Sequence, residues 1–207
     1  MPNTDTPALI LLSLLEAIRN LDTPVEDGLE ELSPEIVSKR LGLSSTVAAQ
    51  IERYRQAALR GGTIAREEAV QVFRLVGRRA DAPLVFADAG RRAARHAVRS
   101  RGGSAPALRR LTPDGLGRRV GRRAAARVAR DIFAAELGFA TAPEARMGAP
   151  ISIAALPDGD GCAFYGAAFA ELLRMLMGFE GAMVHDVCRG HGAEACVWHG
   201  ALAEGYE

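Results

Sequence analysis

The sequence predicts an α+β protein, with a helical region over residues 1–80 and a second region over residues 81–207 in which an antiparallel sheet packs on helices. Capping residues and apolar stripes at helical spacing fill the first region. After Pro143 the pattern changes to short apolar runs separated by glycine-rich turns, which is typical of strands and hairpins. A hydrophobic content of 48% over 207 residues is enough for a core that needs no disulfides.

The N-terminal region carries several helix start and stop signals. Ser33-Pro34-Glu35 is a typical start, because serine caps a helix, proline fits its first position and an acid favours its first turn. The pair Gly61-Gly62 is a typical stop. The expected helices are Pro7–Leu21, Ser33 to Gly42, Ser44 or Ser45 to Leu59, and Glu67–Arg79.

The second region mixes both kinds of element. Residues 83–100 are expected to form a helix, or a short strand leading into one, and a helix is expected over Arg118–Leu137 with Gly138 as its C-cap. An apolar helix follows the turn at Asp158–Gly161. The remaining elements expected are a strand Ile151–Ala155, the helix Cys162–Met177, and strands Ala182–Cys188 and Cys196–Leu202.

Composition argues for a cytoplasmic protein without a membrane span. Three cysteines cannot make a complete disulfide framework. The apolar segment Pro7–Leu15 lacks a basic leader, and it is shorter than the roughly 20 residues that span a bilayer. Charge is uneven, because residues 1–35 are rich in acids while residues 91–130 hold thirteen arginines and one acid, Asp114. Such asymmetry indicates an anionic ligand, an acidic partner or self-association.

The three cysteines suggest a metal site. Cys188 and Cys196 bracket a glycine-rich turn between two strands, and Cys162 stands at a helix start, where the helix dipole favours a thiolate. Three thiolates and one imidazole would favour a tetrahedral Zn²⁺ site. Spacing leaves the fourth ligand open among His185, His191 and His199, and a compact set of Cys188, His191, Cys196 and His199 is an alternative. Three buried, inert thiols are the plainer interpretation.

The stretch Gly161–Gly200 resembles the 4-vinyl reductase domain, a ligand-binding family related to the vesicle-tethering TRAPP subunits. The resemblance rests on a cysteine at a helix start, Ala163-Phe164 with an apolar helix, and Cys188-x3-Gly192-x3-Cys196. It implies a TRAPP-like fold for residues 81–207, and by analogy a homodimer. It also implies a zinc ion on Cys162, His185, Cys188 and Cys196, with His185 where related sensors carry a glutamate. Four protein ligands would make that zinc structural.

Over nearly the whole chain, the sequence resembles the bacteriochlorophyll 4-vinyl reductase members of this family from purple photosynthetic bacteria. The supporting segments are Ser33-Pro-Glu-Ile-Val, Arg66-Glu-Glu-Ala and Asp81-Ala-Pro-Leu-Val-Phe-Ala-Asp-Ala-Gly-Arg91. This implies a tetrapyrrole ligand, of the Mg-protoporphyrin or divinyl protochlorophyllide type. Vinyl reduction would need a hydride carrier, yet Gly159-Asp-Gly161 lacks the third glycine of a dinucleotide fingerprint.

A carrier or assembly factor in bacteriochlorophyll synthesis is therefore the favoured function, and an 8-vinyl (4-vinyl) reductase is the alternative. The acidic N-terminal region and the arginine-rich middle would suit docking to magnesium chelatase or to the methyltransferase that follows it. Candidate ligand-binding residues are Arg91 and Arg95 for carboxylates, His96 for a chelated magnesium, and Phe164 and Phe169 for apolar walls. The plainer interpretations are a solvated arginine face, a hydrogen-bonded histidine and core aromatics.

A second alternative is a ligand-sensing DNA-binding regulator. Residues Ile36 to Ile51 have the pattern of a helix-turn-helix with Gly42 in the turn. The presumed recognition helix offers Gln50 and Arg53 but few other groups that read bases. Nucleic-acid binding is therefore not expected.

Overall fold

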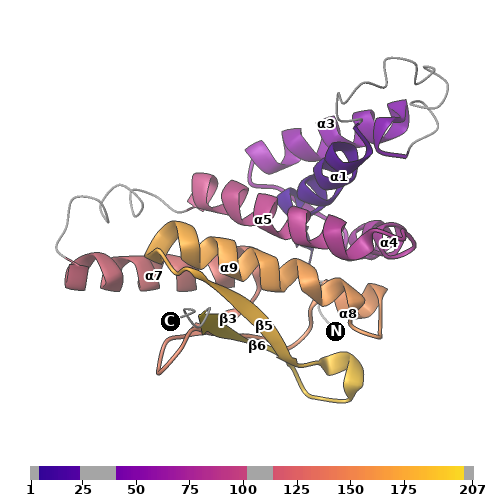
Figure 1. Ribbon diagram of the computed structural model, residues 1–207. Helices are drawn as coiled ribbons and strands as arrows, with labels where there is room; N and C mark the ends of the chain where they lie inside the picture. The colour runs from indigo at the N-terminus through magenta and orange to yellow at the C-terminus, as the bar shows by residue number, and fades with distance from the viewer. Residues whose placement is uncertain (1–4, 24–40, 102–113, 203–207) are drawn as a thin grey trace, which may run out of the picture.

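The computed structural model describes residues 5–23, 41–101 and 114–202, and it confirms a mixed fold of helices and small antiparallel sheets (Figure 1). The helices are α1 (Ala8–Asp22), α3 (Ser45–Leu59), α4 (Arg66–Gly77), α5 (Ala82–Arg101), α7 (Asp114–Phe133), α8 (Ile151–Ala155) and α9 (Ala163–Met177). Short 3₁₀ turns are η1 (Leu41–Leu43), η2 (Asp160–Cys162) and η3 (Arg189–His191).

The N-terminal helices form one side of the molecule. α1 is apolar on nearly every face and packs between α3 and α5, which is typical of a buried helix. The Ser44 hydroxyl accepts a hydrogen bond from the Val47 N–H at 3.3 Å, so the predicted cap of α3 is confirmed. The carboxylate of Asp22, at the end of α1, accepts the Gly42 N–H and binds the Arg79 guanidinium, which fixes η1 against α1.

The other side is a four-stranded antiparallel sheet beneath α9, with strand order β3-β4-β6-β5 (Figure 1). Its strands are β3 (Glu136–Gly138), β4 (Glu144–Met147), β5 (Gly181–Val187) and β6 (Cys196–Leu202). A two-stranded sheet joins β1 (Thr6–Pro7) to β2 (Thr63–Ile64). In β6, Cys196 and Trp198 are fully buried, so one face of the hairpin β5–β6 turns toward the helices.

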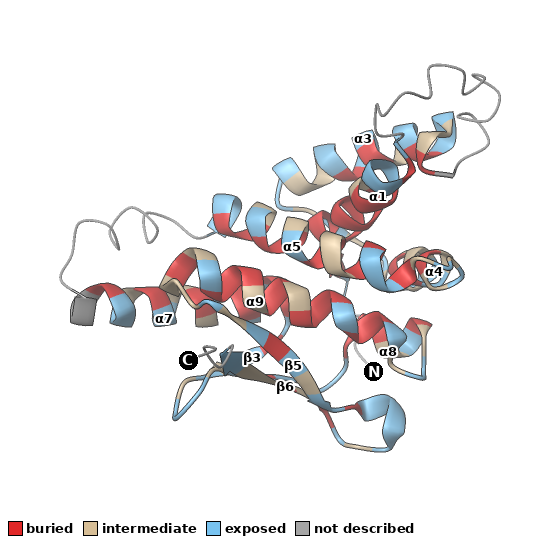
Figure 2. Ribbon diagram, in the orientation of Figure 1, coloured by how far each residue is buried: buried red, intermediate tan, exposed pale blue. Residues whose placement is uncertain are grey.

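Within the described ranges, a continuous hydrophobic core runs from Leu9 to Trp198 and includes both the N-terminal helices and the sheet side. α9 lies at its centre and is buried on most of its surface (Figure 2). Phe164 and Phe169 are 0% exposed and pack edge-to-face on Phe133. Close helix contact explains Gly90, where an added Cβ would lie 2.1 Å from the Phe164 carbonyl oxygen.

Several sequence predictions need correction. Ile151–Ala155 is a helix and not a strand, because an apolar run this short carries no period that separates the two. Residues 83–100 are helical from the start, without a leading strand. The predicted helix Arg118–Leu137 begins earlier and ends at Phe133, because Ala134 turns the chain with φ of 53°.

Two further differences concern the ends of predicted elements. Gly138 lies in strand β3 and is therefore not a helix C-cap, and the sequence prediction missed β3 and β4. Of the predicted helix from Ser33 to Gly42, residues 33–40 lie outside the described residues, and Leu41 and Gly42 belong to η1. Within the described ranges, every helix is too short or too polar to cross a bilayer.

Candidate metal centre

The fold brings together Cys162, His185, Cys188 and Cys196, whose ligand atoms all lie within 4.8 Å of one another. Cys162 ends η2 and immediately precedes α9, His185 lies in β5, and Cys188 and Cys196 flank η3 and its turn. A tetrahedral zinc site with bonds of about 2.3 Å spaces its ligand atoms by roughly 3.8 Å. Small side-chain rotations would therefore close the four groups around one ion.

Two glycines allow the loop before α9 to approach the hairpin. Gly159 has φ of +90°, and an added Cβ would lie 2.8 Å from Cys188 Sγ. An added Cβ on Gly190 would lie 2.0 Å from the Pro157 carbonyl oxygen and 3.4 Å from Cys188 Sγ. Close approach of backbone to a ligand or a ligating side chain is a common reason for glycine. The two loops are therefore shaped to meet around Cys188.

Burial governs the chemistry of the thiols. It raises the pKa of Cys162 to about 12, and it also raises the pKa of Cys196. Cys162 Sγ lies 3.4 Å from the Ser152 hydroxyl, and Cys196 Sγ accepts the Arg189 N–H at 3.3 Å. Without a cation these thiols stay protonated at neutral pH, and a bound metal ion would replace their protons.

The imidazole of His185 is also suited to bind a metal ion. Its ring stacks on Trp198, with centroids 4.7 Å apart, because the two residues are paired in register on β5 and β6. Burial lowers its pKa, which favours the neutral ring that binds metals. Its Nε2 atom is buried and has no hydrogen-bond partner among the described residues. A buried polar nitrogen without a partner is costly, and a metal ion would satisfy it.

The donor set therefore fits a metal ion. Three soft sulfurs and one imidazole match a closed, four-coordinate site, which leaves no position for a reacting water. The ligands come from the start of α9 and from both strands of the hairpin, so an ion here would cross-link these elements. The arrangement suits a structural role.

The alternative set built on His191 and His199 does not assemble. His199 lies on the opposite face of β6 from Cys196 and Trp198. Its ring nitrogens contact Glu144 at 3.6 Å and Asp186 at 3.3 Å. His191 is exposed in η3. Strand alternation thus excludes His199, and the grouping of ligand atoms contains His185 and not His191, a choice that spacing alone left open.

The structure does not bring the predicted ligand-binding residues into one pocket. Phe164 and Phe169 are core residues, and Arg91 is exposed on α5. Arg95 forms a 2.7 Å ion pair with the buried carboxylate of Glu171. His96 lines a pocket, but its Nε2 contacts Glu16 at 3.1 Å and its Nδ1 contacts Arg99 at 3.3 Å. A chelated magnesium would have to displace one of these partners.

Sequence reasoning missed several residues that shape the candidate metal centre. Ser152, Gly159, Gly190 and Trp198 support the ligands, yet none is a ligand itself. The only signal was the Asp158–Gly161 turn, which predicted a bend but not its contact with Cys188. Neither a protein-family model, nor a curated protein, nor a solved structure matches this chain.

Proposed function

We propose that the Cys162–His185–Cys188–Cys196 cluster holds a structural zinc ion in a tetrapyrrole-binding protein of the 4-vinyl reductase kind. In this proposal the protein serves bacteriochlorophyll synthesis as a carrier or assembly factor. The observation that carries the zinc assignment is the convergence of three thiols and one imidazole within 4.8 Å. Soft sulfur and imidazole donors in a closed tetrahedral set favour zinc over hard cations.

A bound zinc ion would hold the hairpin against the start of α9. The turn that contains η3 is largely exposed, and apart from the cysteines it buries little apolar surface there. Metal coordination would compensate for this small apolar contact, as it does in many small metal-stabilised modules. The zinc would thus fix the sheet under α9 and contribute to stability without taking part in a reaction.

The tetrapyrrole assignment is supported by the sequence resemblance and by the chemistry of the ligand. A tetrapyrrole is an apolar macrocycle with carboxylate arms, so it needs an apolar cavity with basic groups at its edge. The arginine-rich α5 borders a cavity of about 540 Å³, a size within the range of small-molecule sites. The closed metal set argues for binding and transfer over zinc-based chemistry, and docking to magnesium chelatase or the methyltransferase belongs to the same proposal.

Metal content measured by mass spectrometry tests the zinc assignment. We expect about one zinc ion per chain in protein purified without a metal-binding tag. Cys162→Ser and His185→Ala should lose the ion, whereas His191→Ala should retain it as the matched control. Wild-type protein without zinc, or loss of zinc in His191→Ala alone, would overturn the assignment.

Titration with protoporphyrin IX and its magnesium complex, followed by fluorescence, tests the carrier function. Saturable binding to zinc-loaded protein supports it, and absence of binding overturns it. A divinyl substrate supplied with NADPH or reduced ferredoxin separates the carrier from a reductase. Turnover by the purified chain would replace the carrier proposal with the reductase alternative.

A further inference from the structure

A groove with an apolar floor and a basic rim lies between α1, α3 and α5. Its residues precede those of the candidate metal centre in the sequence. The main cavity is about 540 Å³ and is lined by Leu9, Leu12, Ala58 and Leu59 together with Arg55, His96, Arg99 and Ser100. Leu9 and Leu12 are buried at its base, whereas Leu59 is 76% exposed at its edge. A large apolar side chain this exposed beside a cavity offers surface for an apolar ligand.

The groove continues into a neighbouring cavity of about 350 Å³. The two cavities share Leu9, Ala58, Leu59 and Ser100. The second adds Arg60 and Arg101, and Asp131 is the one acid among its described lining residues. None of the described residues that line the main cavity is acidic, so the described lining of the whole groove carries an excess of positive charge. An elongated or planar anion fits this shape and charge.

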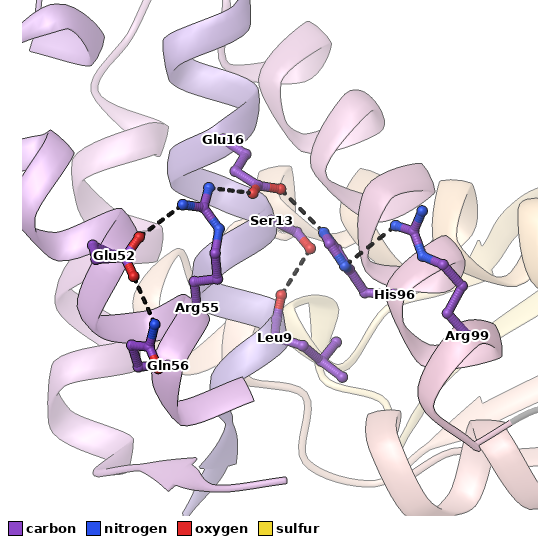
Figure 3. Close-up of polar contacts among 8 residues, drawn as sticks. All are labelled: Leu9, Ser13, Glu16, Glu52, Arg55, Gln56, His96 and Arg99. Atoms are coloured by element: carbon purple, nitrogen blue, oxygen red, sulfur yellow. Dashed lines mark hydrogen bonds and ion pairs between the residues drawn. The ribbon is translucent and has the colours of Figure 1, made fainter. Parts of the chain in front are cut away.

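A network of polar contacts sets the charge at the rim (Figure 3). Glu16 lies at its centre and contacts Arg55 at 3.3 Å and His96 at 3.1 Å. Burial would raise the pKa of Glu16, but the hydrogen bonds from His96 and Arg55 hold it below the usual value. Two carboxylates, those of Glu16 and Glu52, contact the guanidinium of Arg55, so its positive charge is fully neutralised.

Arg99 differs from Arg55 because its guanidinium contacts a ring nitrogen of His96 and not a carboxylate. Its Nη2 donates to Nδ1 of His96 at 3.3 Å, and it forms no ion pair with a carboxylate among the described residues. A guanidinium carries five N–H donors in a planar fork that matches a carboxylate. Within the described part of the chain, Arg99 is therefore a positive charge without a carboxylate partner at the edge of the main cavity. Figure 3 shows its contact with His96.

We propose that this groove binds an amphiphilic carboxylate, with the apolar body on Leu12, Ala58 and Leu59 and the carboxylate on Arg99. A tetrapyrrole with propionate arms has this chemistry, and in that form the proposal rests on the proposed function. A long-chain fatty acid has the same chemistry. His96 then orients Arg99 through its Nδ1 while Glu16 holds the ring, so His96 acts as a positioning residue.

Binding of three probes to the full-length, zinc-loaded chain tests the groove. The probes are protoporphyrin IX, its dimethyl ester, which lacks free carboxylates, and hexadecanoate as a competitor. Arg99→Ala should weaken protoporphyrin IX binding about tenfold, because one charge-assisted hydrogen bond is lost. The dimethyl ester should bind wild type and Arg99→Ala alike. Leu59→Glu, at an exposed position, should also weaken protoporphyrin IX by placing a negative charge at the rim.

Arg127→Ala is the matched control, because it removes an exposed arginine from α7, outside the groove. It should leave binding unchanged, and thermal unfolding should confirm that every variant folds. Equal affinity of wild type, Arg99→Ala and Leu59→Glu for protoporphyrin IX would overturn the groove and leave the carrier function intact. Loss of protoporphyrin IX binding in Arg91→Ala alone would also overturn the groove proposal, because Arg91 does not line either cavity.

The same probes can also support the groove while contradicting the tetrapyrrole function. Hexadecanoate binding that depends on Arg99, with no binding of protoporphyrin IX, would support the groove and overturn the tetrapyrrole function. Absence of binding of both protoporphyrin IX and hexadecanoate would overturn the proposal that the groove binds a carboxylate. Wild type that binds the dimethyl ester as tightly as the free acid would also overturn it, because the carboxylate would then make no contribution.

Discussion

The two sides of this molecule are held in place by different physical means. On the helical side, α1 is buried on nearly all faces between α3 and α5, and arginine–carboxylate pairs join Glu16 in its middle and Asp22 at its C-terminal end to neighbouring elements. On the sheet side, the far end of the hairpin β5–β6 is mostly exposed, and the buried groups there include Cys188, Cys196 and the Nε2 atom of His185. The helical side is therefore stable through apolar burial, whereas the hairpin end has buried sulfur and nitrogen atoms that would need a metal ion as their partner.

This difference teaches where a metal ion contributes most. Apolar burial contributes about 25 cal/mol per Å² whether or not a metal ion is bound. A cluster of protonated thiols with an unpartnered imidazole nitrogen contributes little until an ion binds, and the free energy of metal binding then adds to that of folding. The sheet side should therefore respond to metal removal, while the helical side should respond to the loss of its ion pairs.

The largest expected effect is that of metal removal. At an ion concentration a thousandfold above its dissociation constant, binding stabilises the folded state by about 4 kcal/mol. A strong chelator should therefore lower the free energy of unfolding by about this amount, measured by urea denaturation. Hydrogen exchange should accelerate first in β5, β6 and η3, and later in α1 and α5.

Two results would contradict this prediction. Equal acceleration of exchange in α1 and in the hairpin would mean that the ion stabilises the whole core and not one end of it. Cys196→Ser should respond to chelator hardly at all, because its site is already incomplete. A chelator effect of full size in that variant would place the ion elsewhere.

The next effect concerns an ion pair of the helical core. Glu171 on α9 is 5% exposed and contacts Arg174 and Arg95, each at 2.7 Å. The hydrogen bond from Arg174, opposed by burial and aided by Arg95, lowers its pKa from the ordinary 4.5 to about 2. Both arginines are about half exposed, so screening by solvent reduces the contribution to about 1–2 kcal/mol.

Glu171→Gln should therefore lower the free energy of unfolding by about 1–2 kcal/mol at pH 7. Because the folded-state pKa is depressed, this stabilisation is complete above about pH 4.5 and disappears as the pH falls toward 2. The difference between wild type and variant should shrink over that range in urea denaturation. Asp88→Asn, which breaks the partly exposed pair with Arg92, should cost only about 0.3 kcal/mol. A difference that stays constant from pH 7 to pH 2.5 would contradict the ion-pair explanation.

The four candidate metal ligands could be predicted from sequence only with the help of a resemblance. Cysteine spacing suggested a site, but it could not choose among His185, His191 and His199. The choice depends on strand register, because pairing of His185 with Trp198 puts the imidazole on the face of Cys196. Register is a long-range property that a local pattern does not contain.

Other features were beyond the reach of local patterns for related reasons. The segment Glu144–Met147 alternates exposed and buried residues, yet four residues are too few to distinguish a strand from a loop. The groove joins Leu9, Ala58 and Arg99 from three helices that are distant in sequence. His96 was predicted as a ligand-binding residue, but its contacts with Glu16 and Arg99 follow only from how α1 and α5 pack.

The last prediction compares two glycines near the candidate metal centre that share a backbone conformation. Gly159 has φ of +90° and Gly192 has φ of +92°, so alanine at either position should cost about 1 kcal/mol of backbone strain. An added Cβ at Gly192 meets no atom within 4 Å, whereas at Gly159 it lies 2.8 Å from Cys188 Sγ. Gly159→Ala should therefore weaken zinc binding about tenfold more than Gly192→Ala, because the added Cβ displaces the ligand Cys188. A tenfold loss of affinity corresponds to about 1.4 kcal/mol. Competition with a chromophoric chelator measures this directly, and equal zinc affinities in the two variants would mean that Cys188 does not need the close approach of the Gly159 loop.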